Sequence, residues 1–228
     1  MFFDPLYLIM MAPTIILMLW AQRKVQGTFQ KFSEVPNQRR LSGAETARYI
    51  LDSHGLSDVP VEPVAGQLTD HYDPRSRTLR LSDSVYRSRS VAALGIAAHE
   101  AGHALQHAEG YAPLQARSAL VPVASIGSNF GFIVVIAGIL LQLTTLAWVG
   151  IALFAAGTLF ALITLPVEFN ASSRAMSELE TMGFVDRTEY DQNKKVLNAA
   201  AWTYIAGFAA AVMSLLYWVM VVMGMRRD

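Results

Sequence analysis

The chain has 228 residues, of which 53% are hydrophobic and 16% charged, with a mean hydropathy of +0.33 and a formal net charge of zero. This composition is too apolar and too weakly charged for a typical soluble domain, and it predicts a membrane protein. Because the chain has no glycine-rich phosphate loop and no basic patch, nothing supports a nucleotide or nucleic-acid partner.

The first apolar stretch, residues 1–21, is long enough to cross a bilayer and carries only Asp4 as a charge. It lacks the basic start and the small-residue cleavage site that are typical of a signal peptide. We therefore expect residues 1–21 to be an uncleaved transmembrane helix.

The polar segment 22–118 follows and begins with a recognisable helix start. Ser42-Gly43-Ala44-Glu45 has the S-x-x-E form of a capping box, and Gly55 suits the left-handed turn that ends a helix. The sequence therefore predicts a short helix over residues 43–54.

Two segments with strand character come next, residues 64–72 and 77–81. Asp73-Pro74-Arg75-Ser76 lies between them and has proline at the second position of a turn. We expect a β-hairpin, whose free edge either holds an extended peptide or merely covers the following helix.

Residues 90–108, SVAALGIAAHEAGHALQHA, predict a helix that is apolar nearly all round and therefore buried. His99 and His103 are four apart on one face, so both rings can reach one ion, which removes the cost of burying them unpaired. Zinc on three protein ligands keeps a position for water and lowers its pKa to about 7, and Glu100 can take the proton. His107, about 12 Å of helix rise from His99, cannot share that ion and is predicted to be a polar residue near the helix end.

Three further stretches, residues 119–141, 146–167 and 198–225, carry no charge and are long enough to span a bilayer. With residues 1–21 they make four transmembrane helices, the second and third forming a tight hairpin. We therefore expect one span in residues 1–21, two in residues 119–167 and one in residues 198–228. Residues 22–118 and 168–197 are the expected polar parts.

Four crossings leave residues 22–118 and 168–197 on one side of the membrane. These segments hold 16 of the 18 lysines and arginines, which predicts the cytoplasmic side of a bacterial plasma membrane. Arg226 and Arg227 would then lie on the opposite side of the membrane, contrary to the preference of basic residues for the cytoplasmic side.

Two histidines leave a catalytic zinc site incomplete, so a third donor is needed. Glu168 directly follows the third span, which can return it to the level of the histidines. Its position in a first helical turn also has a simpler explanation as a complement to the helix dipole. Glu178 is the next candidate, and the remaining donors on that side include His54, Asp70, His71, Asp73, Glu180, Asp186, Glu189 and Asp191.

Over nearly its whole length the chain resembles the YugP-like neutral zinc metallopeptidase family of bacterial membrane proteins. The resemblance is carried by LTDHYDPRSRTLRLS, VAALGIAAHEAGHALQHA and LPVEFNASSRA. The family is similar to the HtpX-type membrane gluzincins, whose third zinc ligand is a glutamate in an E-x-x-A-D context. The resemblance implies one Zn²⁺ on His99, His103 and Glu168, with Glu100 as the general base.

Ser172 stands where the related pattern has aspartate. If that aspartate orients a histidine ligand, a neutral serine is a weaker substitute, and orientation falls to Asn170 or another group. A peptidase also needs a donor for the oxyanion, and His71 is the preferred candidate, with Tyr72 and Arg174 as alternatives.

The sequence thus predicts a mainly α membrane protein with four transmembrane helices and a small α+β gluzincin-like zinc peptidase domain. We expect it to hydrolyse membrane or membrane-associated proteins at the membrane surface, because Val91–Ala98 is too short to span. The alternative is a non-catalytic zinc-binding scaffold, against which the intact Glu100 argues. The oligomeric state stays open, since the Gly127 and Gly131 spacing suits packing within one chain at least as well as dimerisation.

Overall fold

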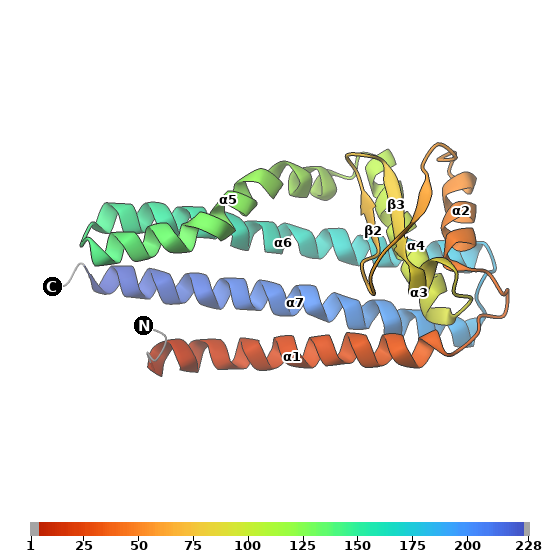
Figure 1. Cartoon of the computed structure of the whole chain (residues 1–228), viewed down its shortest axis with the longest axis horizontal. Helices are drawn as coiled ribbons and strands as arrows, with labels where there is room; N and C mark the ends of the chain where they lie inside the picture. Colours follow the sequence, from red (N-terminus) through yellow and green to blue (C-terminus); the bar gives the residue numbers. More distant parts are fainter. Residues whose placement is uncertain (1–4, 226–228) are drawn as a thin grey trace. The chain divides into compact units, whose positions relative to one another are not determined.

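The computed structural model describes residues 5–225, apart from the side chain of Ser128, and is mainly helical with one small sheet (Figure 1). The chain forms two compact units. We call residues 1–21, 115–166 and 202–228 the apolar unit, and residues 22–114 and 167–201 the polar unit.

Four helices in the described residues are long and apolar enough to cross a membrane, as expected. They are α1 (Pro5–Ser33), α5 (Ala112–Leu140), α6 (Thr144–Thr181) and α7 (Arg187–Gly224). Residues 1–4 of the first predicted span, and Arg226 and Arg227, lie outside the described residues.

These helices extend beyond the predicted spans into the polar segments. The apolar run of α1 ends near residue 21, but the helix continues to Ser33, and α6 continues from the third span to Thr181. Pro166 lies at the end of the third predicted span, where the composition of α6 changes, but the helix continues through it. Glu168 consequently lies inside α6 and not in a first helical turn.

Glycines bring α5 and α6 together within the apolar unit. A Cβ added to Gly127 would lie 2.1 Å from the Leu153 carbonyl oxygen, and one added to Gly150 would lie 2.5 Å from the Val135 nitrogen. Such small residues let two helix backbones approach closely. Gly127 is therefore used in packing within the chain.

The polar unit begins with α2 (Gly43–Ser53), and both hydrogen bonds of its capping box are present. The Ser42 hydroxyl accepts from the Glu45 backbone N–H, and the Glu45 carboxylate accepts from the Ser42 backbone N–H. Gly55 follows the helix with a φ of +71°. The predicted helix and its start are confirmed, and it ends one residue earlier than predicted, at Ser53.

The predicted hairpin is present, but its first strand was placed wrongly. Residues 64–72 are not one strand: β1 (Val61–Val64) pairs in parallel with β3 (Thr78–Ser82), and only β2 (His71–Asp73) is antiparallel to it. Gly66 and Leu68 have positive φ angles of 112° and 56°, which interrupt the extended backbone between β1 and β2. The sheet order is β1-β3-β2.

The hairpin does not lead directly into the helix with the two histidines, because a short helix, α3 (Asp83–Tyr86), intervenes. That following helix is α4 (Val91–Ala108), and α2, α3 and the sheet pack against it (Figure 1). Buried aliphatic side chains from α2, β3, α3, α4 and α6 form one hydrophobic core, which includes Ile50, Leu51, Leu79, Leu81, Val85, Leu94, Leu105 and Leu179.

Candidate metal centre

Helix α4 is built to be the buried centre of the polar unit. The Ser90 hydroxyl caps its start by accepting from the Ala93 N–H, and Gly110 turns the chain after its end with a φ of +67°. In the middle, a Cβ added to Gly102 would lie 2.7 Å from the Ala171 carbonyl oxygen of α6. The glycine between Glu100 and His103 therefore allows α6 to approach the histidines.

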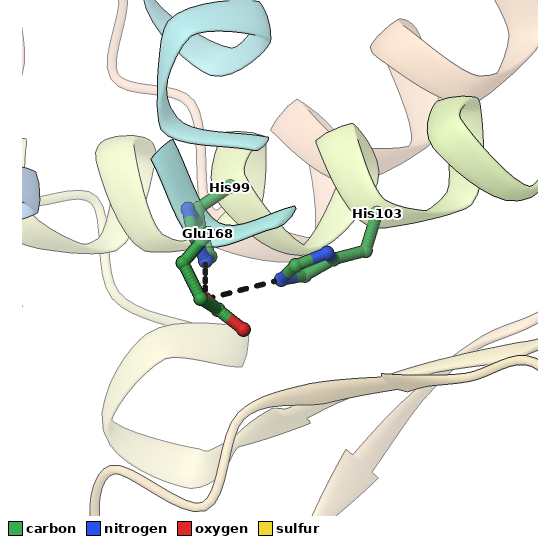
Figure 2. A group of neighbouring side chains, drawn as sticks. All are labelled: His99, His103 and Glu168. Atoms are coloured by element: carbon green, nitrogen blue, oxygen red, sulfur yellow. Dashed lines mark hydrogen bonds and ion pairs between the residues drawn. The ribbon is translucent and has the colours of Figure 1, made fainter. Parts of the chain in front are cut away.

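This approach brings together His99, His103 and Glu168 (Figure 2). The His99 Nε2 and His103 Nε2 atoms lie 3.3 and 3.5 Å from the same Glu168 oxygen, Oε2. The three donor atoms lie within 4.8 Å of one another, and the side chains are 13%, 10% and 3% exposed, respectively. In the described part of the chain, these residues form the one cluster of histidines and acidic groups that could hold a metal ion.

The two nitrogen–oxygen separations fit a pair of zinc ligands better than they fit a direct ion pair. Ligands about 2.0–2.2 Å from a tetrahedral zinc are about 3.3–3.6 Å from one another, which matches both nitrogen–oxygen distances. A charge-assisted N–H···O bond is typically about 2.7–2.9 Å, and both observed distances are longer. Two imidazoles and one carboxylate are also a donor set that leaves a fourth position for water or substrate.

Glu100 lies beside this cluster on α4 and is buried, with 8% of its surface exposed. Within residues 5–225 its carboxylate has no hydrogen-bond partner. Burial raises the pKa of Glu100, and the nearby His99 and His103 partly oppose that rise. A cation held by the cluster would act in the same direction as the histidines and favour the ionised form of Glu100.

Each histidine has a hydrogen-bond partner on its other ring nitrogen. The Ser172 hydroxyl lies 3.1 Å from His99 Nδ1, a contact that can orient this ring. His103 Nδ1 lies 3.0 Å from the Gln106 carbonyl oxygen Oε1. Burial lowers the pKa of His103, but the nearby Glu168 and Glu100 carboxylates outweigh burial and raise it.

Sequence reasoning missed Gln106. The available signal was its position three residues after His103, on the same helix face, as a fully buried amide in an apolar run. Asn170, the predicted alternative orienting group, makes no hydrogen bond to a histidine within the described residues but accepts from Gln106 Nε2 at 2.9 Å.

Several of the other candidate ligands are engaged elsewhere. His54 pairs with Glu178 at 3.0 Å. The Asp70 carboxylate accepts from the backbone and hydroxyl of Ser82, and burial raises its pKa. Asp73 holds the hairpin turn by accepting from the Arg75 N–H.

The three candidate oxyanion donors also have partners. His71 is exposed, and its Nδ1–H donates to the Thr69 carbonyl at 2.7 Å, so a donor role for Nε2 requires the protonated ring. The Tyr72 hydroxyl pairs with His107 Nδ1 at 2.9 Å, and Arg174 makes a bidentate ion pair with Glu109 at 2.7 Å. The oxyanion donor therefore stays a prediction.

Comparison with known proteins bears on this site. A protein-family profile described as "Putative neutral zinc metallopeptidase" matches residues 7–223. The chain belongs to this family. It is also 47% identical over 223 residues to the "Putative membrane protease YugP" of Bacillus subtilis (strain 168), covering 98% of this chain and 99% of that protein. No solved structure matches.

Membership of this family agrees with the two main features described above. The four long apolar helices and a relative named as a membrane protease indicate an integral membrane protein. The zinc in the family description agrees with a buried group of two histidines and one glutamate that could hold a metal. The family also indicates a peptide substrate and a lipid environment.

Proposed function

We propose that the protein is a zinc-dependent endopeptidase of the gluzincin type, with His99, His103 and Glu168 as zinc ligands and Glu100 as general base. The convergence of both imidazole Nε2 atoms on one Glu168 oxygen, at separations typical of a tetrahedral zinc, carries this proposal. A bound zinc ion supplies a Lewis acid that polarises a peptide carbonyl and makes water more acidic.

The residues of the chain supply the rest of the reaction. Glu100 accepts a proton from the attacking water and later returns it to the leaving amine. Its burial and its freedom from hydrogen bonds within the described residues keep its carboxylate available for this role. The donor set of two histidines and one glutamate leaves room for water and substrate, whereas structural zinc sites are usually closed by four protein donors.

An extended peptide is the substrate form that suits the sheet. β2 pairs with β3 and stands at an edge of the sheet, and it packs against α4, which carries the histidines. A peptide can add to such an edge through backbone hydrogen bonds, with selectivity left to side-chain pockets. We propose this edge as the substrate site, with His71 as an oxyanion donor in its protonated form.

The domain arrangement and cellular side are part of the same proposal. Residues 1–21, 119–167 and 198–228 would contribute the spans, while residues 22–118 and 168–197 would form the peptidase at the cytoplasmic face of a bacterial plasma membrane. The concentration of lysine and arginine in these two polar segments supports that side. Membrane or membrane-associated proteins would then be the substrates.

The test compares purified full-length protein with His99→Ala and Glu100→Gln variants, measuring bound metal and cleavage of an unfolded protein such as casein. We expect one zinc per chain in the wild type, its loss in His99→Ala and its retention in Glu100→Gln. Proteolysis by Glu100→Gln should fall by about 10²–10⁴-fold, the usual contribution of a general base. Unchanged proteolysis in Glu100→Gln would contradict the proposal and favour a zinc-binding scaffold.

A further inference from the structure

Behind His103, hydrogen bonds connect α4 to the part of α6 that carries Glu168. Gln106 Oε1 lies 3.0 Å from His103 Nδ1, and Gln106 Nε2 lies 2.8 Å from the Val167 carbonyl and 2.9 Å from Asn170 Oδ1. The Gln106 side chain is fully buried, so its contacts with His103 and Val167 are buried and its contact with Asn170 is partly buried. Val167 and Asn170 stand on either side of Glu168 in the sequence.

The direction of every hydrogen bond in this network is fixed by groups that have only one role. Arg174 can only donate, and its Nε lies 2.8 Å from Asn170, so the Asn170 atom in contact with it is the amide oxygen. The Val167 carbonyl can only accept. The Gln106 atom facing both of these oxygens must therefore be its NH₂ group, and its carbonyl oxygen faces His103.

A carbonyl oxygen can only accept, so His103 Nδ1 must carry a proton. A neutral imidazole has one N–H, and His103 Nε2 is left with its lone pair directed to the Glu168 side. That tautomer can bind a metal through Nε2. His99 differs, because its partner Ser172 has a hydroxyl that can either donate or accept and does not select a tautomer.

We infer that Gln106 is a positioning residue of the metal centre, an inference that rests on the proposed function. Through its oxygen it fixes the tautomer and ring orientation of His103, and through its NH₂ group it holds the Val167 carbonyl and the Asn170 side chain of α6, on either side of Glu168. One side chain thus positions two of the three proposed ligands. A residue that only filled space in the core would contribute neither effect.

The experiment measures the zinc affinity of the detergent-solubilised full-length protein by competition with a chelator. Gln106→Met keeps the approximate volume and removes every hydrogen bond, and we expect a 10–100-fold loss of zinc affinity, the usual range for groups that orient metal ligands. Gln106→Glu keeps an acceptor for His103 Nδ1–H but cannot donate to Val167 or Asn170. Its affinity should lie between those of Gln106→Met and the wild type.

Glu109→Gln is the matched control. It weakens the ion pair with Arg174 at the outer end of the same network and leaves the partner of His103 unchanged. Zinc affinity should stay at the wild-type level. A folded Gln106→Met variant with wild-type affinity, or a Glu109→Gln variant as weak as Gln106→Met, would overturn the inference.

Nitrogen-15 NMR of histidine-labelled wild-type protein tests the tautomer even if Gln106→Met fails to fold. We expect the proton of the neutral His103 ring on Nδ1, with zinc bound through Nε2, after assignment with a His103→Ala sample. A proton on Nε2, or zinc on Nδ1, would refute the role of Gln106. Wild-type protein that binds no zinc but still has the Nδ1 proton would refute the proposed function, and with it the zinc-positioning role, while upholding the hydrogen-bond direction.

Discussion

The two units use the same large apolar residues in opposite ways. In the polar unit, Leu79, Leu94 and Leu105 are buried in one core, as expected of a part that folds in water. In the apolar unit, Leu140 is 74% exposed and Ile133 is 58% exposed, although both belong to a helix able to cross a membrane. The difference indicates two solvents, water around the polar unit and hydrocarbon around the apolar unit.

The two units also hold their helices together differently. In the polar unit, α4 and α6 are linked by a buried amide network and an arginine–glutamate pair. In the apolar unit, α5 and α6 approach at glycines such as Gly127 and Gly150. Because lipid is as apolar as leucine, burying leucine gives helices in a membrane little gain, and close backbone packing replaces it.

Truncation of a buried leucine should show the largest difference between the units. Leu94→Ala removes a fully buried side chain of α4 and should cost about 2–5 kcal/mol of stability. Ile133→Ala removes a side chain that faces lipid and should change stability by less than about 0.5 kcal/mol. Thermal unfolding in detergent or nanodiscs measures both, and equal losses would contradict the assignment of two solvents.

Introduction of a charge should have the larger effect in the apolar unit, the reverse of the effect of truncation. Ile133→Arg places a cation on the exposed face of α5 and should raise the free energy of membrane insertion by about 2.5–3.5 kcal/mol. Leu68→Arg, at an exposed loop position of the polar unit, should be almost neutral. The membrane-inserted fraction of each variant is the measurement. Normal insertion of Ile133→Arg would show that this face of α5 does not contact lipid.

Addition of a methyl group at a glycine should distinguish close packing from open helix surface. Gly102→Ala forces a Cβ against the Ala171 carbonyl and should destabilise the polar unit by about 1–3 kcal/mol, with weaker zinc binding because α6 must shift. Gly207 has nothing within 4 Å of an added Cβ, so Gly207→Ala should gain up to about 1 kcal/mol from helix propensity. A Gly102→Ala variant with wild-type stability and zinc affinity would show that this approach is not tight.

What the sequence could predict depended on how local each feature is. The capping box at Ser42 is complete within four residues, and the pairing of His99 with His103 follows from one helical turn. Glu168 is 65 residues beyond His103, so its place near the histidines was inferred from the length of the intervening spans and from the family resemblance. The clustering depends on Gly102, which lets two backbones approach, and no local pattern encodes that.

Two features could not be predicted for the same reason. The division of residues 64–72 into β1 and β2 depends on the positive φ of Leu68, a conformation that leucine rarely adopts and that its side chain does not signal. The spacing of Gln106 from His103 signals a contact between them, but the direction of its hydrogen bonds is fixed only by Val167 and Asn170 of α6. Both depend on tertiary contacts.

The smallest effect that we predict concerns the start of α2, where the Glu45 side chain is exposed and Ser42 is buried. Ser42→Ala removes the helix cap and should cost about 1 kcal/mol. The Ser42 backbone N–H and hydroxyl both donate to the Glu45 carboxylate, and these bonds lower its pKa in the folded state. A lowered folded-state pKa gives a stabilisation that is present at neutral pH and is lost as the pH falls from about 5 through that lowered value. The melting temperature of Glu45→Gln should therefore depend less on pH over this range than that of the wild type, and parallel pH profiles would mean that Glu45 titrates as it does in the unfolded chain.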